Sequence, residues 1–254
     1  METNSPWRGV IDLARRAYPG FVFGGAVDAA ILPVFHFHGV TKEYLEPHFA
    51  YLRENGYRTV SADEVAHFVR TGKQPGEKAV ALNFDDAWAS SWTVATPLLR
   101  QYGLLATVFV VPGRVPKDDI LRPSITDADG ASRDVDRSAV PFATWPELRA
   151  MQGTGVWDIQ AHTFAHAMVF SDDARLGFVT PDYKPHIHNA PNVGKPTEPH
   201  FLSASDLGAP LYGARSRMSD VLRYDDPDMR KRCLDAVQAG GGAAFLRIRA
   251  GSRN

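Results

Sequence analysis

The sequence predicts an α/β fold, because strand and helix patterns alternate from about residue 31 to residue 170. The predicted strands are nearly continuous apolar runs, which is typical of parallel strands covered by helices. Polar and titratable residues directly follow several of these strands, and functional groups gather at that edge of such sheets. A barrel and a doubly wound sheet both agree with these observations.

Several segments have the apolar, β-branched or aromatic composition of buried strands. In chain order they are residues 31–37, 57–60, 79–84, 105–111 and 156–161. Asn83 is the only polar residue within the third of them. Two stretches without periodicity, residues 116–141 and 175–200, are expected to be long surface loops.

Helix patterns separate these strands. Helices are expected at residues 46–55, 61–69 and 91–102, and a further helix starts at residue 144. Pro47 falls in the first turn of the first helix, where proline is tolerated. Ser61 with Glu64, and Thr144 with Glu147, have the spacing of a capping box, in which two side chains satisfy amides at a helix start.

Composition limits the kinds of partner and of metal site. The 254-residue chain has a formal net charge of −1, which argues against nucleic acid or an anionic membrane as its main partner. Cys233 is the only cysteine, so an internal disulfide and a thiolate-rich zinc site are both excluded. Any bound metal must therefore be held by His, Asp or Glu side chains.

The beginning of the chain does not resemble a targeting segment. Residues 1–10 include acidic and polar side chains and have no apolar core of the kind found in signal peptides. No stretch approaches the roughly 20 apolar residues of a transmembrane helix. We therefore expect a cytoplasmic protein without a transmembrane segment, or an extracytoplasmic protein if a leader has been removed. The sequence does not indicate an oligomeric state.

Two short segments supply two carboxylates and two imidazoles. Asp85 and Asp86 directly follow the third strand segment, and His162 and His166 follow the fifth. A spacing of four residues would place both imidazoles on one face of a helical turn, as in other metal-dependent hydrolases. Adjacent carboxylates on an extended backbone point to opposite sides, so one could bind a metal while the other faces a substrate.

Each of these segments also has a simpler explanation. The Asp pair could be a solvated turn after a strand, and the histidines could pack on or lie at the surface of a helix. However, His36 and His38 lie at the end of the first strand segment, so three strand ends bring titratable groups to the same edge. Together these residues favour a divalent metal site with a neighbouring carboxylate, a combination suited to hydrolysis.

The two motifs also point to a known family. Residues 83–87 read Asn-Phe-Asp-Asp-Ala, and residues 162–166 read His-Thr-Phe-Ala-His. They resemble the Thr-Phe-Asp-Asp-Gly and His-Ser/Thr-x-x-His motifs of the polysaccharide deacetylase (NodB homology) domain, carbohydrate esterase family 4. The flanking residues 51–57, 97–103 and 106–110 are similar to its branch of poly-N-acetylglucosamine deacetylases.

The resemblance implies a distorted or incomplete (β/α)7-type barrel with long irregular loops, formed by residues 1–254 as a single domain with a divergent or truncated C-terminal part. It implies that Asp86, His162 and His166 bind a divalent metal, by default zinc, although other divalent ions fit these donors. Asp85 becomes the general base that activates water, and His38 the acid that protonates the leaving amine. The implied reaction is hydrolytic N-deacetylation of an N-acetylated sugar or glycan, which releases acetate.

Some features depart from the family pattern. Ala87 stands where the motif has glycine, and the turn is strained if φ is positive there. The family's later Arg-x-Pro-Tyr and Leu-x-His segments are not found. Trp88 and Trp92 could stack on a sugar or pack a helix start. A glycan-binding relic, an amide hydrolase acting on a non-sugar substrate and a non-haem Fe(II) oxygenase remain alternatives, although the oxygenases usually have antiparallel β folds.

Overall fold

A computed structural model describes most of the chain. The described residues are 31–127, 135–186, 189–195, 198–219 and 226–251, together with Ala14 and Tyr224. None of the helices in these ranges is long and apolar enough to span a membrane.

The described residues group into two compact units. Those up to Val110 and those from Val115 to His162 form the first unit. Val111–Arg114 and the described residues from Thr163 onward form the second. The expectation that the whole chain is a single domain stays a prediction.

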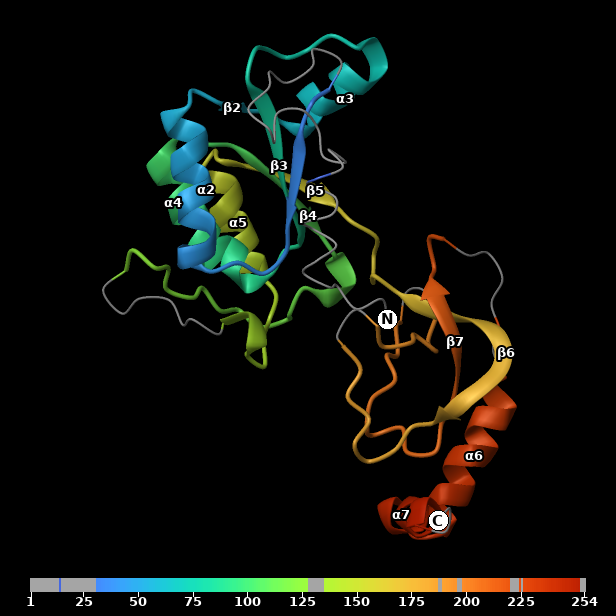
Figure 1. The fold of residues 1–254 in the computed structure, drawn as a ribbon. Coiled ribbons are helices and arrows are strands. Elements are labelled where there is room, and N and C mark those ends of the chain that lie inside the picture. Colours follow the sequence, from blue (N-terminus) through green and yellow to red (C-terminus); the bar gives the residue numbers. More distant parts are fainter. Residues whose placement is uncertain are drawn as a thin grey trace. The chain divides into compact units, whose positions relative to one another are not determined.

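A parallel sheet forms the centre of the first unit (Figure 1). Its strands are β1 (Val34–Phe37), β2 (Arg58–Thr59), β3 (Ala79–Asp86), β4 (Ala106–Val110) and β5 (Trp157–Ala161). The strand order is β1-β3-β4-β5, the short β2 pairs with β3, and every pair is parallel. Among the described strands the sheet does not close, so the prediction of an α/β fold with an incomplete barrel is confirmed.

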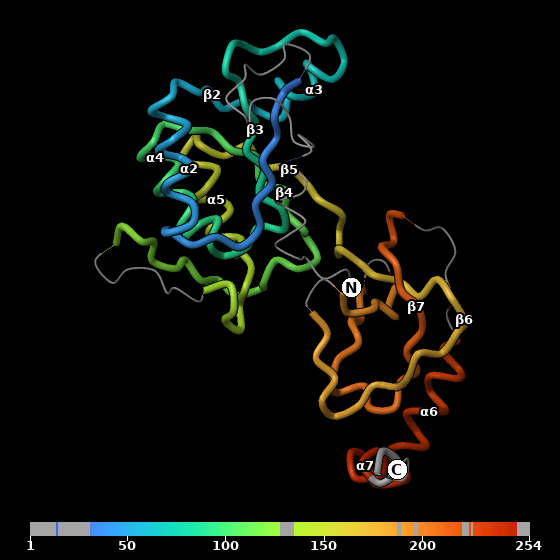
Figure 2. Tube along the Cα trace, in the orientation of Figure 1, coloured from blue at the N-terminus to red at the C-terminus, as the bar shows by residue number. Residues whose placement is uncertain are grey.

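Helices pack on both faces of this sheet (Figures 1 and 2). They are α2 (Lys42–Glu54), α3 (Ala62–Thr71), α4 (Thr96–Tyr102) and α5 (Trp145–Gly153). Side chains alternate along β3, as in any strand. Leu82 and Phe84 belong to the main core with α2, α4 and α5, whereas Ala79 and Ala81 belong to a second cluster with Phe68 of α3.

Two of the helices in the main core begin at other residues, or in another form, than the sequence predicted. Helix α2 starts at Lys42, because Oγ1 of Thr41 accepts a hydrogen bond from the amide of Tyr44 and caps the helix there. Pro47 consequently lies inside α2 and not in its first turn. The helix expected from residue 91 begins as a π-helix, Ser91–Ala95, before α4 continues it.

A buried ion pair fixes the long loop that precedes α5. The side chain of Glu147 is fully buried, and its Oε1 accepts a hydrogen bond from Nε of Arg122 at 2.7 Å. Its Oε2 accepts from the amide of Thr144 at 2.9 Å, which completes the predicted capping box. The guanidinium of Arg122 also donates to the carbonyl oxygen of Phe142 at 2.7 Å. Because Phe142 pairs with Trp88, the ion pair is linked to the segment that follows β3.

An antiparallel ribbon forms the second unit. It consists of β6 (Met168–Phe178) and β7 (Pro210–Ser216), and it is followed by α6 (Pro227–Ala239) and α7 (Ala243–Gly251). A separate small core contains Phe170, Val179, Leu202 and Ala209. The expectation of an irregular loop from residue 175 is partly wrong, since β6 continues through Phe178.

Replacing Glu147 by alanine should lower the free energy of unfolding by about 3–5 kcal/mol, because the largely buried guanidinium of Arg122 would lose its carboxylate. Glu64→Ala is the matched control, since Glu64 completes the capping box of α3 and pairs with Arg58 near the surface. This second change should cost about 1 kcal/mol or less. Urea unfolding followed by circular dichroism measures both values, and equal losses would contradict the role given to burial.

Candidate metal centre

The register of the sheet brings the ends of three strands to one level. Asp86 of β3 lies opposite Val110 of β4, and Val110 lies opposite Ala161 of β5. His162 follows β5 directly, and its amide donates to the carbonyl oxygen of Val110 at 2.7 Å. The pairing of β4 with both neighbours therefore places Asp86 and His162 on either side of its C-terminal end.

The backbone turns sharply where β3 ends. Asp86 and Ala87 have φ values of 70° and 53°, so the chain is not extended at these residues. The expectation that Asp85 and Asp86 point to opposite sides applied to an extended backbone, a condition that Asp86 does not meet. Nε2 of His38 lies 4.0 Å from Oδ2 of Asp85 and also 4.0 Å from Oδ2 of Asp86. The turn thus brings both carboxylates near the same imidazole.

His162 and His166 are connected by an irregular turn and not by a helix. His166 has a φ of 45°, and its amide donates to Oγ1 of Thr163 at 3.1 Å. The carbonyl oxygen of Phe164 accepts from the amide of Gly113 at 2.6 Å. These bonds replace the ones that a helical turn would make, which is why the predicted helical turn is wrong.

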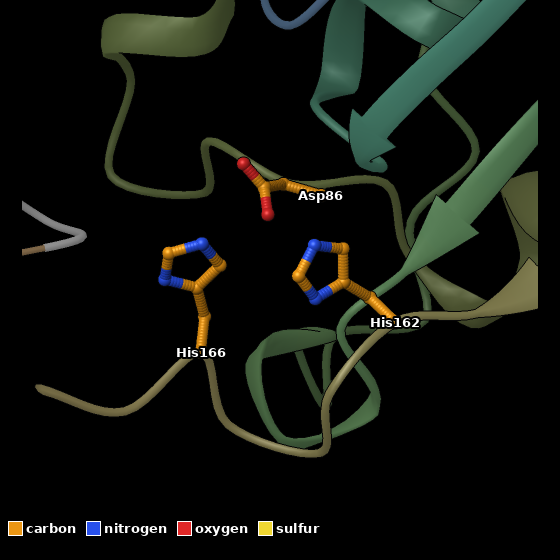
Figure 3. Close-up of side chains that lie close together, drawn as sticks. All are labelled: Asp86, His162 and His166. Atoms are coloured by element: carbon orange, nitrogen blue, oxygen red, sulfur yellow. The ribbon is translucent and has the colours of Figure 1, made fainter. Parts of the chain in front are cut away.

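Although the predicted helical turn is absent at residues 162–166, the side chains of Asp86, His162 and His166 still lie close together, as Figure 3 shows. Asp86, His162 and His166 each offer one ligand atom, and these atoms all lie within 4.8 Å of one another. The side chain of Asp86 is only 1% exposed, and the two histidines are partly buried. Two imidazole nitrogens and one carboxylate oxygen form a donor set that fits a divalent cation. The structure thus brings together the residues expected to be ligands, and their role as ligands stays a prediction.

Asp85 differs from Asp86 in its surroundings. Its side chain is 22% exposed, and its Oδ2 lies 3.7 Å from Nδ1 of His36. His36 and His38 are both more than half exposed. An accessible carboxylate between two imidazoles therefore lies next to a buried carboxylate in the donor set. This contrast is compatible with the separate roles that the resemblance implies for Asp85 and Asp86.

Trp88 and Trp92 pack within the first unit. The ring centroid of Trp88 lies 5.0 Å from that of Phe142, and Nε1 of Trp92 donates to the carbonyl oxygen of Arg122 at 2.8 Å. These contacts favour packing over sugar stacking as the explanation of both residues.

Sequence reasoning did not indicate a cavity that lies beside β1 and α2. Its volume is about 340 Å³, and its wall includes Phe35, His36, Tyr44, Tyr51 and Tyr57. The volume is within the range of small-molecule sites. These side chains come from β1, α2 and the turn before β2. They line one cavity because α2 packs on the sheet, and no sequence pattern indicates this.

Comparison with known proteins finds a family that matches part of this chain. Residues 72–185 match the family model described as polysaccharide deacetylase. This part of the chain is therefore similar to the polysaccharide deacetylase family. The matched segment contains Asp85 and Asp86 as well as His162 and His166.

The chain is similar to two N-deacetylases over part of their length. The poly-beta-1,6-N-acetyl-D-glucosamine N-deacetylase of Escherichia coli (strain K12) is 33% identical over 128 residues, which cover 50% of this chain and 18% of that enzyme. The protein of the same name from Staphylococcus aureus (strain N315) is 25% identical over 126 residues, which cover 50% of this chain and 37% of that protein. The chain therefore spans less than half the length of both.

Solved structures include similar chains as well. The de-N-acetylase from Aggregatibacter actinomycetemcomitans has 26% sequence identity and a TM-score of 0.43, with 56% of this chain and 59% of that chain covered. IcaB from Ammonifex degensii has 20% identity and a TM-score of 0.42, with 54% and 55% covered.

Zinc should stabilise the protein through Asp86, His162 and His166. At a free zinc concentration of 100 times the Kd, the free energy of unfolding should rise by about 2.7 kcal/mol. Asp86→Asn and His162→Ala should abolish this rise, because each removes one donor. His67→Ala, which changes an exposed histidine of α3, is the control and should leave it intact. Chemical unfolding with and without zinc measures the effect, and an unchanged rise in Asp86→Asn would contradict the assignment.

Ala87 should tolerate glycine better than any larger residue. Glycine would relieve a left-handed conformation that costs alanine about 1–2 kcal/mol, but it would also remove a fully buried methyl group worth about 0.8 kcal/mol. Ala87→Gly should therefore change the free energy of unfolding little, whereas Ala87→Val should lower it by about 1–3 kcal/mol. Thermal unfolding compares the two variants, and a stable Ala87→Val protein would contradict the positive φ.

Proposed function

We propose that the protein is a metal-dependent hydrolase that removes the acetyl group from the nitrogen of an N-acetylated sugar or glycan. The observation that carries this proposal is the convergence of Asp86, His162 and His166 next to the accessible carboxylate of Asp85. The match of residues 72–185 to the polysaccharide deacetylase family model supports it. We take the substrate class from the name of the Escherichia coli relative, which acts on poly-beta-1,6-N-acetyl-D-glucosamine.

Asp86, His162 and His166 would hold the cation. Zinc is the first candidate, because two imidazoles and one carboxylate form zinc sites that keep a position open for water or substrate. Other divalent ions also accept these donors. When bound, the cation would polarise the acetamide carbonyl and lower the pKa of a coordinated water to about 7.

Asp85 and His38 would carry the protons. Asp85 takes a proton from the attacking water, whose oxygen forms a bond to the carbonyl carbon. His38 gives a proton to the nitrogen as the carbon–nitrogen bond breaks, so the products are acetate and a free amine. Nε2 of His38 lies 4.0 Å from both carboxylates, and its side chain is 59% exposed, so it can reach a substrate. His36, beside Asp85, is placed to orient that carboxylate.

The reaction is tested by acetate release from an oligomer of N-acetylglucosamine. A chelator should abolish acetate release, and added zinc should restore it. Asp85→Asn should lower kcat by roughly 10²- to 10⁴-fold, because it removes the base, while the stabilisation by zinc persists. Asp63→Asn, which changes an exposed acidic residue in the first turn of α3, is the matched control. Acetate release that survives both chelation and Asp85→Asn would refute the mechanism.

The same preparation distinguishes the other functions that the site could serve. Sugar binding without turnover would indicate a glycan-binding relic. Acetate release from N-acetyl-lysine but not from the sugar oligomer would indicate an amide hydrolase with a non-sugar substrate. Bound iron together with oxygen consumption would indicate an oxygenase, although the parallel sheet argues against that class.

A further inference from the structure

Two side chains outside the metal centre, those of Ser90 and Asp136, connect the turn that begins with His38 to the segment that follows Asp86. The amide of Val40 donates to Oγ of Ser90 at 2.9 Å, and the amide of Ser90 donates to Oδ1 of Asp136 at 2.8 Å. Val40 belongs to the turn that follows β1 and begins with His38. Ser90 belongs to the segment that follows Asp86 at the end of β3. The two turns are therefore joined through Ser90 and Asp136.

Asp136 also packs directly against the first of these turns. A Cβ atom on Gly39 would lie 2.6 Å from Oδ2 of Asp136, so the carboxylate occupies the space that a side chain at Gly39 would need. Ser90 is fully buried at the same contact. Burial raises the pKa of Asp136, and the hydrogen bonds from Ser90 act in the opposite direction. The carboxylate of Asp136 therefore contacts both turns, at Gly39 and at Ser90, and is not a solvated surface group.

We propose that Asp136 and Ser90 are positioning residues that hold the imidazole of His38 against the carboxylates of Asp85 and Asp86. This inference rests on the proposed function, in which His38 supplies a proton to the leaving amine. The side chain of His38 is 59% exposed, so its position depends strongly on the backbone of its own turn. The contacts of Gly39 and Val40 with Asp136 and Ser90 fix that backbone.

The metal ligands are held in a different way. Asp86 and His162 are placed by the register of β3 and β5 with β4, in which Asp136 takes no part. Loss of the Asp136 contact should therefore displace His38 and leave the donor set in place. A displacement of about 1 Å in a reacting group can lower a rate by about 100-fold. The proposal thus predicts a loss in kcat that is separate from metal affinity.

Asp136→Ala should lower kcat for acetate release by roughly 10- to 100-fold, with the zinc affinity and KM within about twofold of wild type. Asp136→Asn keeps an oxygen that can accept from the amide of Ser90, so it should restore most of the activity. Asp127→Ala is the matched control, because Asp127 lies in the same loop and its Oδ2 accepts from the nearby amide of Ser124. It should leave kcat unchanged.

A second measurement does not require turnover. The ring resonances of His38, assigned in ¹H–¹⁵N spectra with a His38→Gln variant, should shift in Asp136→Ala and stay unchanged in Asp136→Asn and Asp127→Ala. Ser90→Ala, which removes the acceptor for the amide of Val40, should shift them too and replaces Asp136→Ala if that variant does not fold. An inactive wild-type protein would refute the proposed function, while the spectra still decide whether Asp136 positions His38.

Unaltered His38 resonances in both Asp136→Ala and Ser90→Ala would overturn the positioning role, whatever happens to kcat. A fall in unfolding temperature with full activity of the folded fraction would overturn it as well, because a purely structural residue gives that result. Shifted resonances together with a lower kcat and rescue by Asp136→Asn would establish it.

Discussion

The parallel pairing of β4 with β3 on one side and β5 on the other determines where the candidate metal centre can form. Register changes only in whole residues, and each residue advances a strand by about 3.3 Å. A shift of two residues would move a ligand by roughly 7 Å, farther than the 4.8 Å that now encloses the donor atoms of Asp86, His162 and His166. A shift of one residue would turn the side chains to the other face. The core that fixes this register is therefore also a requirement of the site.

Backbone strain is concentrated next to the same strand ends. Asp86, Ala87 and His166 all have positive φ, a conformation that costs L-residues free energy and persists only where surrounding contacts enforce it. The enforcing contacts beside β3 are visible, since the carbonyl oxygen of Ala87 accepts from the amide of Ala143 at 2.8 Å. That amide belongs to the segment beside Phe142, which Arg122 and Glu147 hold. A buried ion pair thus helps to maintain a strained turn at the site.

The sequence predicted those features that local chemistry determines. Apolar runs indicated the parallel strands, the capping boxes at Ser61 and Thr144 indicated two helix starts, and strand ends indicated the residues that converge. The left-handed turn at Asp86 could not be predicted, because aspartate is compatible with either conformation and contacts with distant residues decide between them. In the same way, a proline at residue 47 suggested a helix start, but the cap at Thr41 determined it.

Contacts between distant residues explain most of what the sequence did not reveal. Arg122 and Glu147 are 25 residues apart, and Ser90 and Asp136 are 46 apart. Neither pair has a spacing that any helix or strand pattern would indicate. Both carboxylates lie in or after a stretch that reads as an irregular polar loop, where acidic residues are normally solvated. The full burial of Glu147 and the partial burial of Asp136 are consequences of the folded arrangement, in which that loop packs on the turns at the end of the sheet.

The groups of the site are consequently held with different strengths. The strand ends that lead to Asp86 and His162 belong to a ladder of backbone hydrogen bonds with β4. The turn that carries His38 is attached through single hydrogen bonds, and each contributes only about 1 kcal/mol net. Loss of one such hydrogen bond would therefore displace His38 more readily than Asp86 or His162.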